Sequence, residues 1–489
     1  MRRRGRLTAQ ALWHAGAVGI CLGSILAAGR ARADGAFPGS SGIVAPASRP
    51  HEILLGTNFG VVTSIDDGQT WTYACERDES AFGSQYQLGA PPQSRLYALS
   101  DSGFVFSDNG GCSWGVAGGA IAGDLVNDAF PDPTNVDRVL AIGSTAAIDG
   151  GSPVVKVFAS TDGGKTFGTT LYTASGGDNV TGIEVARSSP STVYMTMLTS
   201  TFAPKLGRSA DGGNTWMIRE LAPVLGADVR SVRLIAIDPD KADRLFLRAG
   251  LSGDDRLVVS DDGGVTARTA LDLHGVMRAF VRTPSGRLIV AGTVGVTPVA
   301  FLSTDDAQTF QPLPAPPNLI GLAARGGNIY GLTDTQLEDY ALFISTDEGT
   351  SWQPLMAFAD IQAIAACAKA QCQDDCQMRA DIDQWPAEMC AATPAPKPVD
   401  GGDSGSDGGA GGGGASGRGG AGGVSGQAGA AGDASDASGA GGKSGAGCHC
   451  TVDGGSRPGT PLAAVALAAV FTVAALRQRR RRWGRLKRQ

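Results

Sequence analysis

Short runs of alternating apolar and polar residues, separated by turn-forming residues, extend from about residue 42 to residue 358. Segments such as SRLYALS, DRVLAIGS and DRLFLRAG each follow a turn rich in Pro, Asp, Asn or Ser. Ahead of most of them lies another short apolar run, for example VTGIEVAR or VRSVRLIAID. An apolar period of two predicts β-strands that pack face to face. The pattern therefore predicts an all-β domain with a repeating four-stranded unit.

An eight-residue motif, Ser-x-Asp/Asn-x-Gly-x-Thr/Ser-aromatic, recurs seven times in step with these strands. Its copies are SIDDGQTW, SDNGGCSW, STDGGKTF, SADGGNTW, SDDGGVTA, STDDAQTF and STDEGTSW, which begin at residues 64, 107, 160, 209, 260, 303 and 345. Successive copies start 42 to 53 residues apart. A repeat of this length indicates propeller blades or a solenoid. Seven four-stranded units predict a seven-bladed β-propeller over residues 34–360, which leaves only short sheet edges.

Each position of the motif has a structural task. An acid or amide in third place can accept backbone N–H groups and close a turn, and a glycine in fifth place permits a positive φ. The third-place residues are Asp66, Asn109, Asp162, Asp211, Asp262, Asp305 and Asp347. The aromatic in eighth place opens the next strand and packs beneath it. These aromatic residues are Trp71, Trp114, Phe167, Trp216, Phe310 and Trp352.

These seven copies resemble the Asp-box (BNR) repeats of sialidases, sortilin-type receptors, some glucanases and photosystem II stability factors. The resemblance covers residues 42–358. It implies that each box lies between the third and fourth strands of a blade, typically away from the ligand face. It also implies that the box carboxylates form turns and take no part in acid–base chemistry.

The sequence gives little support for catalysis. Before the first box, only Arg49-Pro50 stands where sialidases have an Arg-Ile-Pro motif. Acids outside the boxes, for instance Asp124, Asp128, Glu184 and Asp228, could form the carboxylate pair of a glycoside hydrolase. Two histidines, no HExxH and no G-x-S-x-G in this region predict no metal site and no cofactor. The leading hypothesis is a non-catalytic binding propeller for a glycan or a polypeptide. The alternatives are a glycoside hydrolase and an envelope assembly factor.

Six cysteines are candidates for disulfide bonds. Four of them lie in residues 361–392, which we predict to be a small helical cap with helical character over 361–379. The six are Cys75, Cys112, Cys367, Cys372, Cys376 and Cys390. The four cap cysteines allow three pairings among themselves, and Cys75 could pair with Cys112. Disulfides are favoured over zinc because the cap contains no histidine and an exported protein meets an oxidising environment.

Both ends of the chain carry targeting features. Residues 1–33 have four early arginines, an apolar run and Ala-Arg-Ala, which predicts a signal peptide cut before Asp34, with twin-arginine export the less favoured route. Residues 393–447 are a Gly/Ala/Ser-rich flexible linker. In residues 448–489, Cys448 and Cys450 precede an apolar run at 461–476 and an arginine-rich tail, an arrangement that resembles a myxobacterial C-terminal sorting signal. This resemblance implies processing near Cys448, a membrane segment and display on the cell envelope or secretion.

The charge balance excludes one class of partner. The chain has 41 Lys and Arg against 47 Asp and Glu, and residues 1–33 and 477–489 hold 14 of the bases and none of the acids. The region between them therefore carries a formal charge of about −20. Such an acidic surface repels phosphate backbones, so we predict no nucleic-acid partner.

Overall fold

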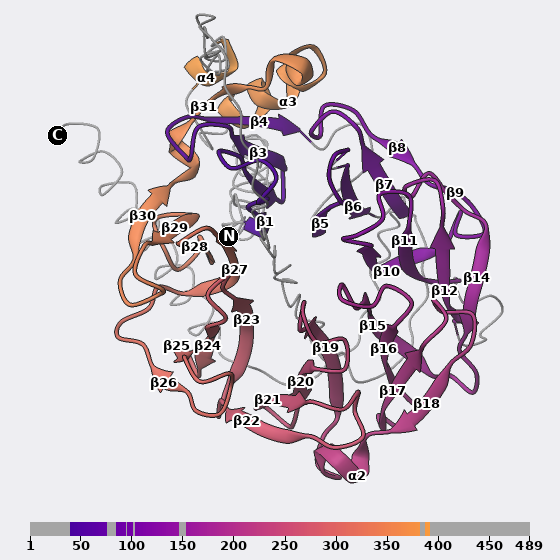
Figure 1. Cartoon of the computed structure of the whole chain (residues 1–489). Helices are drawn as coiled ribbons and strands as arrows, with labels where there is room; N and C mark the ends of the chain where they lie inside the picture. The colour runs from indigo at the N-terminus through magenta and orange to yellow at the C-terminus, as the bar shows by residue number, and fades with distance from the viewer. Residues whose placement is uncertain are drawn as a thin grey trace, which may run out of the picture. The chain divides into compact units, whose positions relative to one another are not determined.

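The computed structural model describes residues 40–75, 85–93, 95–100, 103–145, 153–381 and 387–391. They form seven antiparallel sheets arranged around a central channel (Figure 1). Each sheet contains four strands in chain order, and the first sheet has one additional strand. The prediction of an all-β, seven-bladed propeller followed by a small Cys-bearing helix is thus confirmed.

The strands of each blade run in chain order from the channel outwards. Blades 1 to 3 contain β1 Ser40–Val44, β2 Ile53–Thr57, β3 Gly60–Ser64 and β4 Trp71–Cys75; β5 Gln85–Leu88, β6 Leu96–Ser100, β7 Gly103–Ser107 and β8 Gly115–Val116; and β10 Leu125–Pro131, β11 Val139–Ser144, β12 Val155–Ser160 and β14 Thr169–Thr173. Blades 4 and 5 contain β15 Asn179–Val185, β16 Val193–Leu198, β17 Pro204–Ser209 and β18 Met217–Glu220; and β19 Ser231–Ile237, β20 Leu245–Gly250, β21 Asp255–Ser260 and β22 Arg268–Asp272. Blades 6 and 7 contain β23 Val276–Arg282, β24 Leu288–Val294, β25 Thr297–Ser303 and β26 Gln311–Pro312; and β27 Leu319–Arg325, β28 Asn328–Thr333, β29 Leu342–Ser345 and β30 Gln353–Met356. A two-residue parallel pair, β9 Gly118–Gly119 with β13 Thr166–Phe167, joins blades 2 and 3.

The core lies between successive blades. Second strands such as β2 and β11 are buried at every position, because both faces of a blade are covered by its neighbours. They accordingly read as continuous apolar runs such as Val-Leu-Ala-Ile. At about 25 cal/mol for each Å² of apolar surface buried, this repeated packing supplies most of the stabilisation of the ring.

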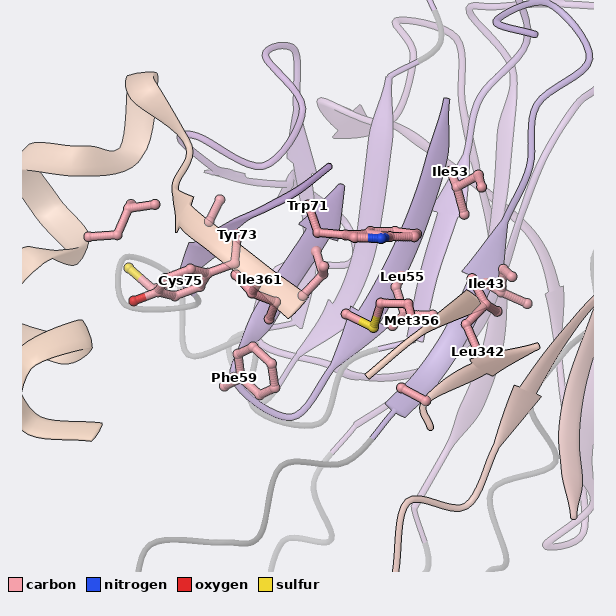
Figure 2. Packing of buried hydrophobic residues seen from close by; sticks show 14 of the residues in the cluster. Ile43, Ile53, Leu55, Phe59, Trp71, Tyr73, Cys75, Leu342, Met356 and Ile361 are labelled. Atoms are coloured by element: carbon pink, nitrogen blue, oxygen red, sulfur yellow. The ribbon is translucent and has the colours of Figure 1, made fainter. Parts of the chain in front are cut away.

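The ring is closed by a segment that follows blade 7. The strand β31, Ile361–Ile364, pairs in parallel with β4 and becomes the fifth, outermost strand of blade 1. Figure 2 shows Ile361 packed beside Tyr73, and Met356 of blade 7 beside Leu55 of blade 1. Residues from both ends of the propeller therefore share one hydrophobic cluster.

The remaining described elements are short helices. They are α2 Ala222–Leu225, η1 Phe358–Asp360, η2 Ala366–Ala368, α3 Lys369–Asp381 and α4 Glu388–Ala391. The prediction of helical character from residue 361 is wrong for its first four residues, because the exposed edge of β4 takes up Ile361–Ile364 as a strand.

Several sequence-based predictions fall on other parts of the chain. The signal peptide at 1–33, the linker at 393–447 and the sorting signal at 448–489, with Cys448, Cys450 and the apolar run at 461–476, lie outside the described residues. Within the part of the chain that the structure describes, no helix has the length and apolar character needed to cross a membrane.

Candidate functional site

All seven boxes lie at one end of the blades, in the turn between the third and fourth strands. The first serine of every box is the last residue of a third strand. Its Oγ donates to the third-place side chain at 2.7 to 3.0 Å. The same Oγ accepts the fifth-place backbone N–H at 2.8 to 3.0 Å. We call this end of the ring the box face.

The third-place side chain then fastens the far side of the turn. In blade 4, Asp211 Oδ1 accepts the backbone N–H of Thr215 at 2.9 Å, and Oδ2 accepts its hydroxyl at 2.7 Å. These bonds lower the pKa of Asp211 to about 2. In blade 2 the amide Asn109 has the same place, and its Nδ2 donates to Ser113 Oγ at 2.9 Å. The carboxylates are thus occupied within their own turns and do not converge on a common site.

An arginine of one blade binds the box of the next blade. Arg138 of blade 3 donates to the carbonyl oxygen of Gly212 in blade 4 at 3.0 Å, and Arg95 of blade 2 donates to Gly163 in blade 3. Where the fourth place of the box is acidic, the arginine binds the side chain. These pairs are Arg244 with Asp306, Arg287 with Glu348 and Arg325 with Asp67. The boxes therefore connect neighbouring blades as well as strands within a blade.

These arginines were not identified from the sequence, although a signal was present. In four of the seven blades an arginine stands directly before the second strand, in the segments SRLYALS, DRVLAIGS, DRLFLRAG and GRLIVAGT. Asp132, whose side chain is 1% exposed, holds Arg138 through an ion pair of 3.1 Å. A repeated Arg before a buried strand could have been read as a contact between blades.

A cavity of about 240 Å³ lies where the inner strands end on the box face. All seven blades contribute to it, mainly through aliphatic, phenylalanine and proline side chains. The prolines are Pro46, Pro91, Pro131, Pro133 and Pro239. Its polar side chains are Ser48, Glu184, Arg187 and Arg282. The cavity and the boxes therefore lie at the same end of the ring.

Two of the acids named from the sequence lie near this cavity. Asp128 is on β10 and Glu184 on the neighbouring inner strand β15, and Glu184 lines the cavity. Glu184 Oε2 accepts the backbone N–H of Ile237 at 3.1 Å. Asp128 Oδ1 accepts the N–H of Ala129 at 3.0 Å and lies 4.0 Å from Arg233 Nη2. Both carboxyl groups therefore accept backbone N–H groups of the inner strands that line the channel.

The surroundings of Glu184 alter its protonation. Burial, together with the nearby Asp128 carboxylate, raises the pKa of Glu184 to about 8. Burial also raises the pKa of Asp128. Glu184 is therefore largely neutral near pH 7. The other two acids lie at the opposite end of the ring, where Asp228 pairs with Arg256 at 3.3 Å and burial raises the pKa of Asp124.

Asp128 and Glu184 can be compared with the carboxylate pair of a glycosidase. Glycoside hydrolysis requires two carboxyl groups on opposite sides of the scissile bond, about 5 to 9.5 Å apart. Asp128 and Glu184 instead lie on the same wall of the channel and hold its backbone. Among the described residues, no group of three or more His, Cys, Asp or Glu side chains could hold a metal ion.

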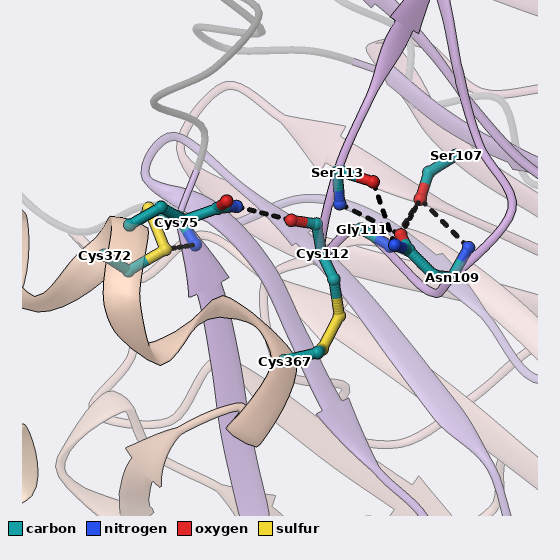
Figure 3. The surroundings of a disulfide bond; sticks show 9 residues. Cys75, Ser107, Asn109, Gly111, Cys112, Ser113, Cys367 and Cys372 are labelled. Atoms are coloured by element: carbon teal, nitrogen blue, oxygen red, sulfur yellow. Dashed lines mark hydrogen bonds between the residues drawn. A yellow bond between two sulfur atoms is a disulfide. The ribbon is translucent and has the colours of Figure 1, made fainter.

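All six candidate cysteines of the described region form disulfide bonds. The pairs are Cys75–Cys372, Cys112–Cys367 and Cys376–Cys390. The suggested Cys75–Cys112 pair is wrong, because Cys75 ends a fourth strand whereas Cys112 lies in a box at the other end of its blade. Figure 3 shows the segment from Cys367 to Cys372 between these two cysteines: Cys367 is bonded to Cys112 and Cys372 to Cys75. We call residues 361–391 the clasp, since they join blade 7 to blades 1 and 2.

Comparison with known proteins gives a similarity of fold alone. No family model matches the chain, and no curated protein matches it. A GH74 xyloglucanase from Xanthomonas campestris has a TM-score of 0.41 and 17% identity, covering 56% of this chain and 47% of that one. A GH74 enzyme from Niastella koreensis has a TM-score of 0.36 and 15% identity, covering 65% and 46%. YCF48 bound to D1 peptide has a TM-score of 0.34 and 14% identity, covering 48% and 68%. The chain thus spans less than half the length of these GH74 enzymes.

Proposed function

We propose that the protein is a non-catalytic binding propeller that holds an apolar side chain of a polypeptide in the cavity on the box face. The observation that carries the proposal is a cavity built by all seven blades, with a mostly apolar wall. Concave, largely preformed and apolar sites with a few polar groups are the usual form of binding sites.

The composition of the wall favours a polypeptide over a glycan. Phe130, Ile235 and Ile237 are half-buried and offer apolar contact, whereas the described lining contains no Trp or Tyr. A sugar would place hydroxyl groups against aliphatic carbon, and each unpaired hydroxyl would cost about 1 to 3 kcal/mol. An aliphatic or aromatic side chain has no such cost.

The hydrolase alternative has less support. Glu184 has the raised pKa of a general acid, but its Oε2 already accepts a backbone N–H, and among the described residues no second carboxylate lines the cavity. A binding role uses the neutral Glu184 as part of the wall and needs no catalytic partner.

The test is a selection of random twelve-residue peptides displayed on phage against the full chain, in parallel with a glycan array. Replacing Ala236 by Trp fills the cavity, and Ala370→Trp, at an exposed position of α3, is the matched control. We expect selected peptides to lose at least about tenfold in affinity in the Ala236→Trp variant alone. Glycan binding without peptide binding, or sugar hydrolysis that disappears in Glu184→Gln, would overturn the proposal.

We further propose that the protein is exported and displayed on the cell envelope, by way of the signal peptide at 1–33 and the sorting signal at 448–489. Three disulfides support an oxidising compartment. Mass spectrometry of surface protein tests the processing step: a chain ending near Cys448 is expected, and an intact arginine tail would contradict it.

A further inference from the structure

The face of the ring opposite the boxes exposes large apolar side chains at several turns. This face, which we call the loop face, consists of the turns between second and third strands and the connections between blades. Phe202 is 62% exposed in blade 4, Val296 is 92% exposed in blade 6 and Leu337 is 66% exposed in blade 7. Leu125, at the start of β10, is 56% exposed. These side chains come from blades 3, 4, 6 and 7 and lie on the same face of the ring.

Phe202 is held in a strained backbone conformation. Its φ is 63°, in the left-handed region that bulky residues rarely adopt. Thr199 fixes this turn, because its carbonyl accepts the N–H of Phe202 and its Oγ1 accepts the N–H of Ala203, both at 2.9 Å. A glycine would fit this backbone without strain, so the phenyl group at this position has a local energetic cost.

The loop face is acidic. Its described turns carry eight carboxylates, whereas Arg230 is the one Lys or Arg that they contain. The carboxylates belong to Asp124, Asp178, Asp228, Asp254, Asp334, Glu338, Asp339 and Asp360. Neighbouring strands neutralise two of them, since Asp178 pairs with Lys205 at 3.1 Å and Asp228 with Arg256 at 3.3 Å. The remaining negative potential attracts cations and repels anionic lipid and nucleic acid.

We propose that the loop face is a docking surface for a polypeptide segment that combines cationic and large apolar side chains. The apolar tips would supply the buried contact, and the surrounding carboxylates would select the charge and steer the encounter. This surface is independent of the cavity on the box face, so either site can fail its test while the other holds.

The test measures fluorescence anisotropy of labelled synthetic peptides with the full chain at low and high salt. The probes are a Lys-Leu-Ala repeat, a Lys-Ser-Ala repeat without large apolar groups and a Glu-Leu-Ala repeat of opposite charge. We expect only the Lys-Leu-Ala repeat to bind, with an affinity that falls as salt increases. Equal binding of the Lys-Ser-Ala repeat, binding of the acidic repeat or no binding at all would overturn the proposal.

Variants then locate the contact. The triple change Phe202→Ser, Val296→Ser and Leu337→Ser is expected to weaken binding of the Lys-Leu-Ala repeat at least about tenfold. Val265→Ser, in the box of blade 5 and 48% exposed, is the matched control and should leave binding within about twofold. Phe202→Gly separates folding from docking, because it should raise the unfolding temperature and still weaken binding. Unchanged binding in the triple variant, or an equal loss in the control, would contradict the assignment, as would self-association of the chain that the triple variant abolishes.

Discussion

The guanidinium of Arg325, on the last blade of the ring, donates a hydrogen bond of 2.8 Å to the carboxylate of Asp67, on the first. The same arginine donates to the carbonyl oxygen of Glu52 in blade 1 and, at 2.9 Å, to the hydroxyl of Tyr330 in its own blade. Arg325 therefore forms an ion pair between blade 7 and blade 1. Arg244 and Arg287 form the same kind of ion pair between successive blades. The ring thus closes through the polar contact that also joins its interior blades.

Replacing Arg325 by Met should lower the free energy of unfolding by about 2 kcal/mol, since the Glu52 carbonyl loses its donor and Asp67 its partner. Arg230→Met is the control, because that guanidinium binds carbonyls of its own turn. Denaturant unfolding followed by tryptophan fluorescence measures both. Equal stability of the two variants would show that the contact does not hold the ring closed.

The box of blade 6 allows a test of the fifth-place glycine. Ala307 stands there with a φ of 64°, so Ala307→Gly removes strain and loses one buried methyl group, two effects of about 1 kcal/mol that nearly cancel. Gly264→Ala in blade 5 meets the same strain, and its new methyl would lie 2.3 Å from Leu206. We expect a loss of at least about 2 kcal/mol for Gly264→Ala and less than about 1 kcal/mol in either direction for Ala307→Gly, measured by thermal unfolding. The opposite order would refute the turn geometry.

Removing disulfides should affect stability according to the length of chain that they close. Cys75 and Cys372 are 297 residues apart and Cys376 and Cys390 only 14. The chain-entropy relation then gives about 6 kcal/mol for the first loop taken alone, about 4 kcal/mol when the Cys112–Cys367 bond shortens that loop, and about 3 kcal/mol for the second. Paired Cys→Ser variants, compared by denaturant unfolding, should show the larger loss for Cys75/Cys372. A greater loss for Cys376/Cys390 would indicate that the clasp acts only locally.

Low pH should reduce the stability that the box carboxylates contribute. The pKa of Asp211 is lowered to about 2, so its contribution to stability is present above the ordinary pKa of about 4 and is lost as the pH falls towards 2. Asp211→Asn should make the decline of stability between pH 4 and 2 less steep, because an amide donates to Thr215 as Asn109 does to Ser113. Asp240→Asn, outside the boxes, is the control. An unchanged acid slope in Asp211→Asn would contradict this role.

The ionisation of Glu184 should lower the free energy of unfolding as the pH rises, whereas that of the box carboxylates raises it. Its pKa is raised to about 8, so the neutral form favours the folded state, and this contribution is lost as the pH rises from about 4 towards 8. Glu184→Gln keeps an acceptor for Ile237 and cannot ionise, so its unfolding free energy should change less between pH 5 and pH 8 than that of the natural protein. The same pH dependence in both would place Glu184 in a more solvated position than the structure gives.

The sequence was sufficient to predict the fold because the box repeats at nearly blade length and each copy performs the same local task. The turn around Ser64, Asp66 and Gly68 depends on neighbours within five residues, so the residues that form it can be recognised from the sequence alone. By contrast, the Cys75–Cys372 pair joins residues 297 positions apart, and no local sequence pattern indicates which distant cysteine is the partner. The strand at Ile361 was also hidden, since four residues take up strand geometry only when β4 offers an edge.

The candidate sites were harder to predict for a related reason. Asp128 and Glu184 were recognised as acids outside the boxes, but their position on one wall depends on how neighbouring inner strands align. The cavity is assembled from short pieces of seven blades, and each piece alone resembles an ordinary strand end. Phe202 carries no sequence signal at all, because its unusual backbone angle appears only in three dimensions.

The clasp also determines which part of the propeller would bear a mechanical force applied to the carboxyl-terminal side. Tension applied beyond Ala391 would reach Cys390, pass through sulfur to Cys376 and then through Cys372 to Cys75 on blade 1. Blade 7, whose strands contain no cysteine, would be bypassed. A domain stretched from its carboxyl end would therefore resist unravelling from that end until covalent bonds failed.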